Sequence, residues 1–473
     1  MAVIKMHRKC FPLIAYVILS VWLVYQTKEF SFYDNGDFTR VFGIFFGEKI
    51  HVGFPTNFNY RIIFPDAIEL KDISSSTIFF GVMALFQFVY DYNYSLLTTS
   101  LFGKLFASLS VLLLGLSASK SLKVNRVVKS VMIFALLVIT FLPYNIAIFN
   151  TIYTEYVLFI AMPMLIALII KVDKHYTDYI SLALVSIVCG AAKTQFFYIP
   201  SLVLIAGLIA ESSWKALTIQ RTVPLIIAQF ICLIPLSGNQ FQQLNYYHST
   251  YLGSYLTASD ETLNTIGLTE MQKSCIGTDA WGHFIGSAQS ETIISEKDSC
   301  VNERSLTLND VLAVYARQPS AFVKLVQQAL PVHFTVEYFH VTGDLRYLYS
   351  IERGRENGYN RGHILVDIMD IRSAITLPLL IVMSLTSFVF LMVSKIPTGV
   401  RSAIATLSLF VISQIVICLL GEGVRDLSRH LSAAQFALDI LTVLNITCAV
   451  WLVSRYQPLQ RLDKPLSSGC QTS

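Results

Sequence analysis

Long apolar stretches, separated by short polar segments, run through most of the chain. A helix needs about 17–25 mostly apolar residues to cross a bilayer, so we expect about ten membrane-spanning helices. They lie near residues 10–27, 95–118, 130–149, 155–171, 179–193, 196–211, 222–238, 373–394, 401–420 and 431–453. The apolar segment Thr77–Tyr90 is shorter, and we expect a helix that lies at the membrane interface or re-enters it without crossing.

Composition supports this interpretation. Hydrophobic residues make up 54% of the chain and charged residues only 14%, whereas soluble domains average roughly 25% charged residues. The sequence therefore predicts an all-α integral membrane protein.

Basic residues indicate which ends of these helices share a side. With the N-terminus inside, every inward loop carries Lys or Arg, from Lys5, Arg8 and Lys9 to the cluster Lys120–Lys129 and on to Arg455. Both termini are then cytoplasmic. If Thr77–Tyr90 crossed the membrane, the Lys120–Lys129 cluster and every later loop would be inverted, so that alternative is disfavoured.

The basic start also resembles a signal-peptide n-region, but Leu19–Tyr25 lacks a small-residue cleavage site, which favours an uncleaved first helix.

This topology divides the chain into four parts. An N-terminal transmembrane region, 1–238, contains a first outer loop at 28–94, and a large outer loop spans 239–372. A C-terminal transmembrane region, 373–458, precedes a polar tail, 459–473. Cys275 and Cys300 both fall in the large outer loop, where an oxidising compartment would allow them to pair, although sequence does not supply the geometry.

Four polar clusters lie on the outer side in this topology. They are Tyr33–Arg40, Tyr153–Tyr156, Lys193–Gln195 and Gly421–His430. An ionised side chain beside hydrocarbon costs several kcal/mol and is usually kept for function. Their shared side therefore suggests an active site at the membrane surface.

The first cluster contains Asp34, Asp37 and Arg40. A carboxylate there suits a general base, or the pair suits a divalent cation, and Arg40 would orient the acid or bind phosphate. The structural alternative is a turn around Asn35–Gly36, with one Asp capping a helix that begins at Phe38.

The second and third clusters are smaller. Glu155, with Tyr153 nearby, is either a catalytic acid or an acid favoured by a helix N-terminus. Lys193 lies in a tight hairpin between two apolar helices, where it either binds phosphate or extends toward lipid headgroups.

The fourth cluster is the densest in ionisable side chains. Arg425 and Arg429 are four residues apart, so one helical face would present two guanidinium groups, which match phosphate oxygens. The alternative is a surface network of Arg with Asp and Glu. The remaining members are Glu422, Asp426 and His430. Asp439, deeper in the last span, should be buried and should have a partner.

These features resemble the GT-C glycosyltransferases, which are integral membrane enzymes that take sugar from a polyprenyl-phosphate carrier. The segment Asn35–Arg40 is similar to their first-loop signature of Gly-Asp-aromatic followed by Arg, and Thr77–Tyr90 would be their interfacial helix. By this resemblance, Asp37 is the base and Asp34 the second candidate. The layout looks most like the O-antigen-modifying, serotype-converting glucosyltransferases of bacteria and prophages.

The resemblance implies an inverting transferase in the bacterial inner membrane, with its active site in the periplasm. It would move a hexose, glucose by analogy, from a polyprenyl-phosphate-linked donor to O-antigen polysaccharide of lipopolysaccharide. Lys193, Arg425, Arg429 and, beside them, His430 would hold the phosphate. Besides the lipid bilayer we expect no nucleic acid partner and no obligatory cofactor, with a divalent cation left open. An O-antigen polymerase and a transporter of polysaccharide or lipid-linked sugar are the alternatives.

Overall fold

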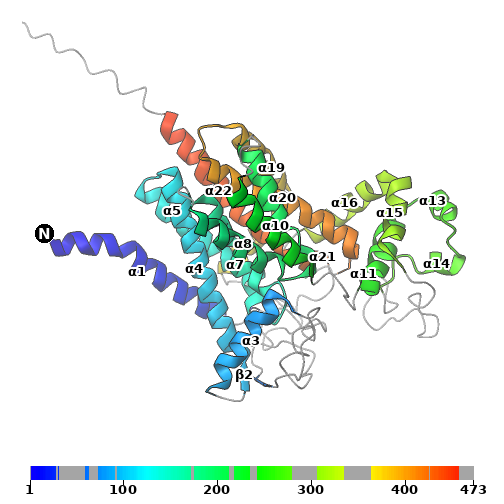
Figure 1. The fold of residues 1–473 in the computed structure, drawn as a ribbon, viewed down its shortest axis with the longest axis horizontal. Helices are drawn as coiled ribbons and strands as arrows, with labels where there is room; N and C mark the ends of the chain where they lie inside the picture. The colour runs from blue at the N-terminus through cyan, green and yellow to red at the C-terminus, as the bar shows by residue number, and fades with distance from the viewer. Residues whose placement is uncertain are drawn as a thin grey trace, which may run out of the picture.

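The computed structural model describes residues 2–27, 30, 59–62, 73–90, 93–171, 175–211, 218–234, 242–279, 306–334, 364–425 and 427–456. Asp34, Asp37, Arg40 and Asp426 lie outside these ranges. In the described part nearly every element is a helix (Figure 1). The prediction of a helical membrane protein is therefore confirmed at this level. It missed a short antiparallel pair, β1 (Asn59–Arg61) with β2 (Asn93–Ser95), which places Tyr60 opposite Tyr94.

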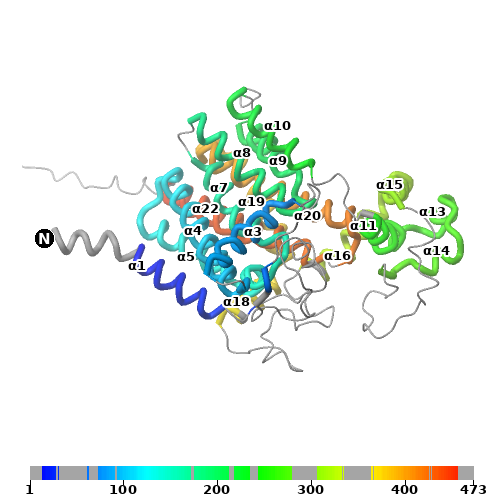
Figure 2. The backbone as a smooth tube through the Cα atoms, turned by 60° about the horizontal axis from the view of Figure 1, so that its bottom comes forward, coloured from blue at the N-terminus to red at the C-terminus, as the bar shows by residue number. Residues whose placement is uncertain are grey.

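A bundle of apolar helices forms the body of the protein (Figures 1 and 2). Its helices are α4 (Leu96–Leu122), α5 (Arg126–Thr140), α6 (Pro143–Ile146), α7 (Tyr156–Ile170), α8 (Tyr176–Gly190), α9 (Ile199–Glu211), α10 (Ile219–Leu233), α18 (Ile364–Ala374), α19 (Thr376–Met392), α20 (Thr398–Glu422), α21 (Leu427–His430) and α22 (Ser432–Tyr456). Two 3₁₀ turns lie in the connections between these helices, η3 (Ala147–Asn150) before α7 and η4 (Thr194–Phe196) before α9.

Two further helices lie at the edge of the bundle. Helix α1 (Ala2–Gln26) projects away from it toward the N-terminus, and α3 (Ser75–Phe88) packs near the start of α4 (Figure 1). Helix α3 coincides with the short apolar segment for which an interfacial helix is predicted. Its outward residues are apolar, with Ile78 and Val82 both more than half exposed, as a helix against lipid requires.

A separate group of helices lies beyond one end of the bundle in both views (Figures 1 and 2). It is built from the middle of the chain and corresponds to described parts of the predicted large outer loop. The members are α11 (Gln242–Ser249), the π-helical turn η7 (Thr250–Ser254), α12 (Tyr255–Thr257), α13 (Asp260–Thr265), α14 (Glu270–Ser274), α15 (Leu308–Arg317) and α16 (Pro319–His333). We call this group the outer unit.

Four helices in the described ranges are long and apolar enough to cross a membrane, and six if two bent pairs each count as one span. The bends measure 62° between Arg126–Thr140 and Pro143–Asn150, and 66° between Asp367–Ala374 and Thr376–Met392. Several other apolar helices are shorter, among them α7, α8 and α10. The count of ten spans remains a prediction.

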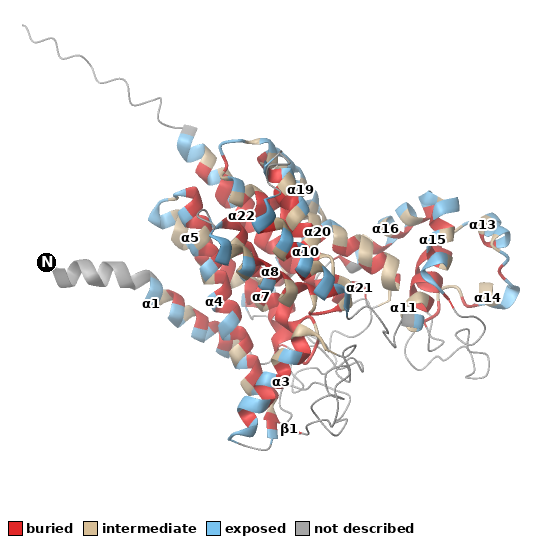
Figure 3. Cartoon of the chain, in the orientation of Figure 1, coloured by how far each residue is buried: buried red, intermediate tan, exposed pale blue. Residues whose placement is uncertain are grey.

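The bundle is apolar inside and also apolar on much of its outer surface. Figure 3 shows buried residues concentrated where the helices meet. Outward residues of α19 are nevertheless large and apolar, with Leu385 63% and Met392 70% exposed. Exposed apolar surface on this scale indicates a surrounding lipid phase.

Both bent helix pairs meet at one buried acid, Asp439 of α22. Its carboxylate pairs with Arg372 at 2.6 Å and accepts hydrogen bonds from the Tyr144 hydroxyl and, at 3.2 Å, from the Asn145 amide. Arg372 lies in α18 just before the bend into α19, and Tyr144 and Asn145 lie just after the bend that ends α5. The expectation that Asp439 is buried with a partner is confirmed. Its partner Arg372 was missed, because the predicted span began one residue later.

We expect Arg372→Met to destabilise the protein strongly, because removing one member of a buried ion pair leaves the other charge unpaired, at a cost of about 3–5 kcal/mol. The double variant Arg372→Met/Asp439→Leu should recover part of this loss. Thermal unfolding in detergent measures both changes. Asp178→Asn is the control, because Lys171–Asp178 is an exposed pair that contributes little. A melting temperature of Arg372→Met equal to that of the parent would contradict this role.

Candidate functional site

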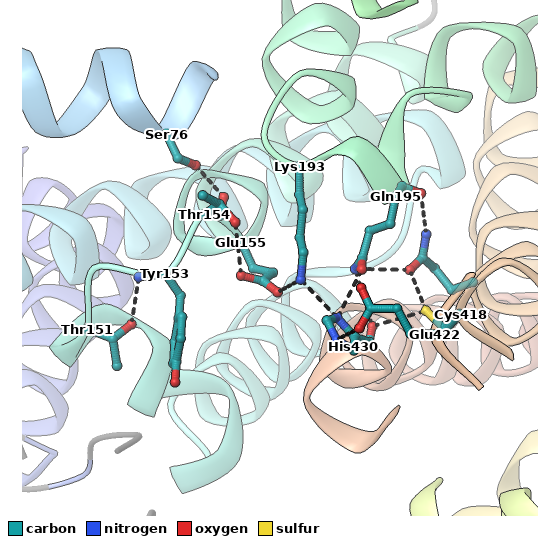
Figure 4. Close-up of polar contacts among 11 residues, drawn as sticks. Ser76, Thr151, Tyr153, Thr154, Glu155, Lys193, Gln195, Cys418, Glu422 and His430 are labelled. Atoms are coloured by element: carbon teal, nitrogen blue, oxygen red, sulfur yellow. Dashed lines mark hydrogen bonds and ion pairs between the residues drawn. The ribbon is translucent and has the colours of Figure 1, made fainter. Parts of the chain in front are cut away.

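Three of the predicted polar clusters converge at one end of the bundle. Glu155 is the residue immediately before α7, Lys193 lies in the turn between α8 and η4, and His430 ends the short helix α21. Figure 4 shows their side chains pointing toward one another. Three segments that lie far apart in the chain therefore form one cluster, in which the contacting pair Lys193 and His430 is separated by 237 positions.

Lys193 is at the centre of this cluster. Its ammonium group donates to Glu155 Oε1 at 2.7 Å and lies 2.9 Å from Nδ1 of His430. Lys193 is 7% exposed and Glu155 1%. The alternative in which Lys193 extends toward the headgroups is wrong for this structure, because its ammonium group turns inward to a carboxylate. Glu155 occupies the cap position of α7, but its carboxylate makes this ion pair and no capping bond.

His430 joins this ion pair to Glu422 of α20. Its Nε2 lies against the Glu422 carboxylate, and its Nδ1 contacts both Lys193 and the side-chain oxygen of Gln195, the latter at 3.1 Å. His430 is buried, whereas the Glu422 side chain is 19% exposed. The cluster therefore runs from a fully buried acid to one that solvent reaches (Figure 4).

The two arginines of the fourth polar cluster occupy different surroundings. Helix α20 ends at Glu422, and α21 begins only at Leu427, so Arg425 lies in the turn between them. The prediction that Arg425 and Arg429 share one helical face is therefore wrong. Arg425 pairs with Asp279 of the outer unit at 3.0 Å, and Arg429 lies over the Tyr153 ring at 4.9 Å. The alternative of an Arg–Asp/Glu network is thus realised in part.

Gly423 explains why the helix stops here. Its φ is +61°, a conformation that glycine adopts without steric cost. The next residue, Val424, donates its backbone N–H to Leu252 O of the π-helical turn at 3.0 Å. A Cβ on Gly423 would lie 2.5 Å from that same oxygen. The outer unit is therefore fastened to the site by a backbone contact that has no room for a side chain, together with the Arg425–Asp279 pair.

Helix α3 fastens the other two segments. The Ser75 backbone N–H donates to Ala191 O at 3.0 Å, two residues before Lys193, and its hydroxyl donates to Val188 O at 2.6 Å. The Ser76 hydroxyl donates to Thr154 O, next to Glu155. The N-terminus of α3 thus holds the backbones that present Glu155 and Lys193. Sequence reasoning identified the helix but missed these serines, whose only signal is their place at a helix start.

The end of α1 is also tied to this region. The Thr27 carbonyl accepts hydrogen bonds from Lys104 and Asn150, both at 3.1 Å, and Asn150 also donates to Phe30 O. Asn150 lies just before Tyr153 and Glu155 in the chain. The start of the predicted first outer loop therefore leaves the bundle beside the site. Asp34, Asp37 and Arg40 follow within that loop, outside the described residues.

Cys275 of the outer unit is disulfide-bonded. Its predicted partner, Cys300, lies outside the described residues, so the identity of the bond remains a prediction.

Nearby, burial raises the pKa of the Tyr247 hydroxyl to about 12, and this hydroxyl hydrogen-bonds Thr278 at 2.9 Å, next to Asp279. The face of the outer unit that meets the site is thus packed and hydrogen-bonded.

Among the described residues, no group of three or more His, Cys, Asp or Glu is arranged to hold a metal ion. The chemistry that the described cluster supports is binding of an anion by Lys193, Arg425 or Arg429 and proton exchange at Glu422 or His430.

Several helices long and apolar enough to cross a membrane, packed in one bundle, define a polytopic integral membrane protein. Buried charges are paired at one end of that bundle. Residues 2–461 match the family model described as the YfdI N-terminal transmembrane domain, and the chain belongs to that family. It is similar to the uncharacterized protein YfdI of Escherichia coli (strain K12), with 25% identity over 322 residues. That match covers 65% of this chain and 66% of the relative, just under two thirds of its length. No solved structure matches the chain.

We expect Gly423→Ala to loosen the outer unit from the bundle, because alanine pays about 1–3 kcal/mol for this backbone conformation and also meets Leu252 O. Limited proteolysis of the folded protein should show faster cleavage within residues 239–372. Gly421→Ala is the matched control, because a Cβ there meets nothing within 4 Å. Equal cleavage rates in the two variants would show that the close contact does not fasten the unit.

Proposed function

We propose that this protein is an inverting glycosyltransferase of the bacterial inner membrane. It moves a hexose, glucose by resemblance, from a polyprenyl-phosphate donor to O-antigen polysaccharide at the periplasmic face. The observation that carries the proposal is the convergence of Glu155, Lys193, His430 and Glu422 in one cluster at one end of an apolar bundle. A membrane-embedded donor with an anionic head needs such a site at the lipid boundary.

In this proposal Asp37 removes the proton of the acceptor hydroxyl as that oxygen attacks the anomeric carbon. The bond from that carbon to the phosphate oxygen breaks, and the polyprenyl phosphate leaves with the electron pair. The transition state has oxocarbenium character, as in other glycosyl chemistry. One displacement inverts the anomeric centre, and the phosphate needs no protonation to leave.

Cations near the departing phosphate stabilise the charge that grows on it. Among the described cations of this region, Arg425 is the most accessible, with a side chain 36% exposed, whereas Arg429 and Lys193 are buried. Lys193 is engaged with Glu155 in this structure, so its role as a phosphate ligand requires a change in its contacts. The outer unit, fastened at Gly423 and Arg425, is placed to receive the polysaccharide.

A transporter of lipid-linked sugar is the second candidate, and one observation favours it. Transporters build their sites from discontinuous helices with charged groups between them. The two bent helix pairs and the Arg372–Asp439 pair at their meeting point have that character. The two activities separate experimentally, because only a transferase forms a glycosidic bond in detergent solution.

We expect purified parent protein to transfer radiolabelled glucose from polyprenyl-phosphoglucose to isolated O-antigen lipopolysaccharide in detergent. Asp37→Asn should reduce the rate by at least a hundredfold, since general-base catalysis contributes about 10²–10⁴. Lys193→Met should also reduce the rate, because it removes the cation that pairs with the buried Glu155 carboxylate. Asp178→Asn is the control, because this acid lies at the opposite end of α8 and pairs with the exposed Lys171.

Transfer by the parent that persists in folded Asp37→Asn would keep the reaction and reject this base. Absence of transfer from any polyprenyl-phosphate hexose, with facilitated movement of the lipid in vesicles, would reject the transferase and favour the transporter.

A further inference from the structure

One nitrogen of the cluster has two neighbours that suit opposite protonation states. Nδ1 of His430 lies 2.9 Å from the Lys193 ammonium and 3.1 Å from Oε1 of Gln195. An ammonium group only donates hydrogen bonds, so it requires an unprotonated Nδ1. An amide oxygen only accepts, so it requires a protonated Nδ1. The surroundings are thus prepared for both the neutral and the charged ring.

The other nitrogen favours the charged ring. Nε2 lies against the Glu422 carboxylate, and a nearby carboxylate stabilises imidazolium. Lys193 opposes that charge while it remains in contact with Nδ1. The contacts of Nδ1 therefore suit one ring form when Lys193 lies beside it and the other when it contacts Gln195 alone.

The described charges of the cluster are balanced when His430 is neutral. Lys193, Arg425 and Arg429 are matched in number by the acids that surround them, which are Glu155, Glu422 and Asp279. A bound phosphodiester would bring one further negative charge close to these groups, and a nearby negative charge favours the protonated imidazole. Histidine is the side chain whose ordinary pKa is closest to neutrality, so it is the group that gains a proton at least cost.

We propose that binding of an anionic phosphodiester at this site is coupled to uptake of one proton by His430. Nδ1 no longer accepts a hydrogen bond from Lys193 and is protonated from solvent. The resulting Nδ1–H then donates a hydrogen bond to Gln195 Oε1. The Lys193 ammonium, repelled by the imidazolium, turns one N–H toward a phosphate oxygen. The anion is the diester head of the polyprenyl-linked donor, so the inference rests on the proposed function and adds how the site accepts its charge.

The groups that face His430 in the described part of the chain fit this exchange. Glu422 and Cys418 come from α20, Lys193 from the turn after α8, Gln195 from η4, Glu155 from the position before α7 and Arg429 from α21. Gln195 is itself held in place, since its backbone carbonyl accepts from Gln414 at 3.2 Å.

Isothermal titration calorimetry of the full chain in detergent tests the coupling, with farnesyl phosphoglucose as the probe. This diester carries one fixed negative charge near neutral pH, so any proton uptake belongs to the protein. Titration at pH 7.5 in HEPES and in Tris gives the number of protons from the difference in observed heat. We expect up to one proton per bound diester, and an affinity that falls by up to tenfold for each pH unit between the His430 pKa of the free protein and that of the diester-bound protein.

His430→Gln should bind the diester without proton uptake and with an affinity independent of pH. Gln195→Leu keeps the titrating ring but removes its acceptor, so it should reduce uptake and weaken binding at pH 7.5. His175→Gln, a change at the far end of α8, is the matched control and should behave as the parent.

Tight binding with no proton uptake would overturn the coupling and leave the transferase proposal intact. Uptake that persists in His430→Gln would assign the proton to another group and overturn the role of His430. Equal displacement of the probe by phosphatidylglycerol would identify a lipid headgroup as the occupant and overturn the donor assignment. No binding of the diester at any pH would count against both proposals.

Discussion

The rest of this structure depends on one constraint, that a charge placed beside hydrocarbon must have a partner. Lys193 lies in a turn between apolar helices and meets Glu155 at the start of another. An unpaired ammonium or carboxylate in such a place costs several kcal/mol. The pair therefore fixes how the ends of α7, α8 and α9 lie together, and His430 brings α21 to the same point.

Hydropathy and charge predicted the helical class, the short helix at α3 and the segments that carry polar chemistry. They did not predict how those segments pair. Lys193 is 38 positions from Glu155 and 237 from His430, and no periodicity links residues so far apart. The prediction that Arg425 and Arg429 share a helical face was wrong, because it required a continuous helix where Gly423 ends one. A glycine between Glu422 and Val424 was the available signal.

The outer unit and the bundle meet at the residues that directly follow Glu422 of the cluster. Val424 and Gly423 hold the π-helical turn through Leu252, and Arg425 holds Asp279. Helix α3 reaches the cluster from the opposite side through Ser75 and Ser76. These contacts connect both the outer unit and α3 to the segments that carry Glu155, Lys193 and Glu422.

Two buried ionic clusters in the described part of the chain differ in their exposure to solvent. Around Asp439 both charged partners are almost fully buried, at 8% and 3% side-chain exposure, and hydrogen bonds from neighbouring side chains surround them. Such a cluster sets the geometry of two bent helices. The cluster around Lys193 ends instead at Glu422 and Arg425, which solvent reaches. A cluster with an accessible end can exchange protons with solvent or receive an anion, and this difference is why we propose the site at Lys193 and His430 and not at Asp439.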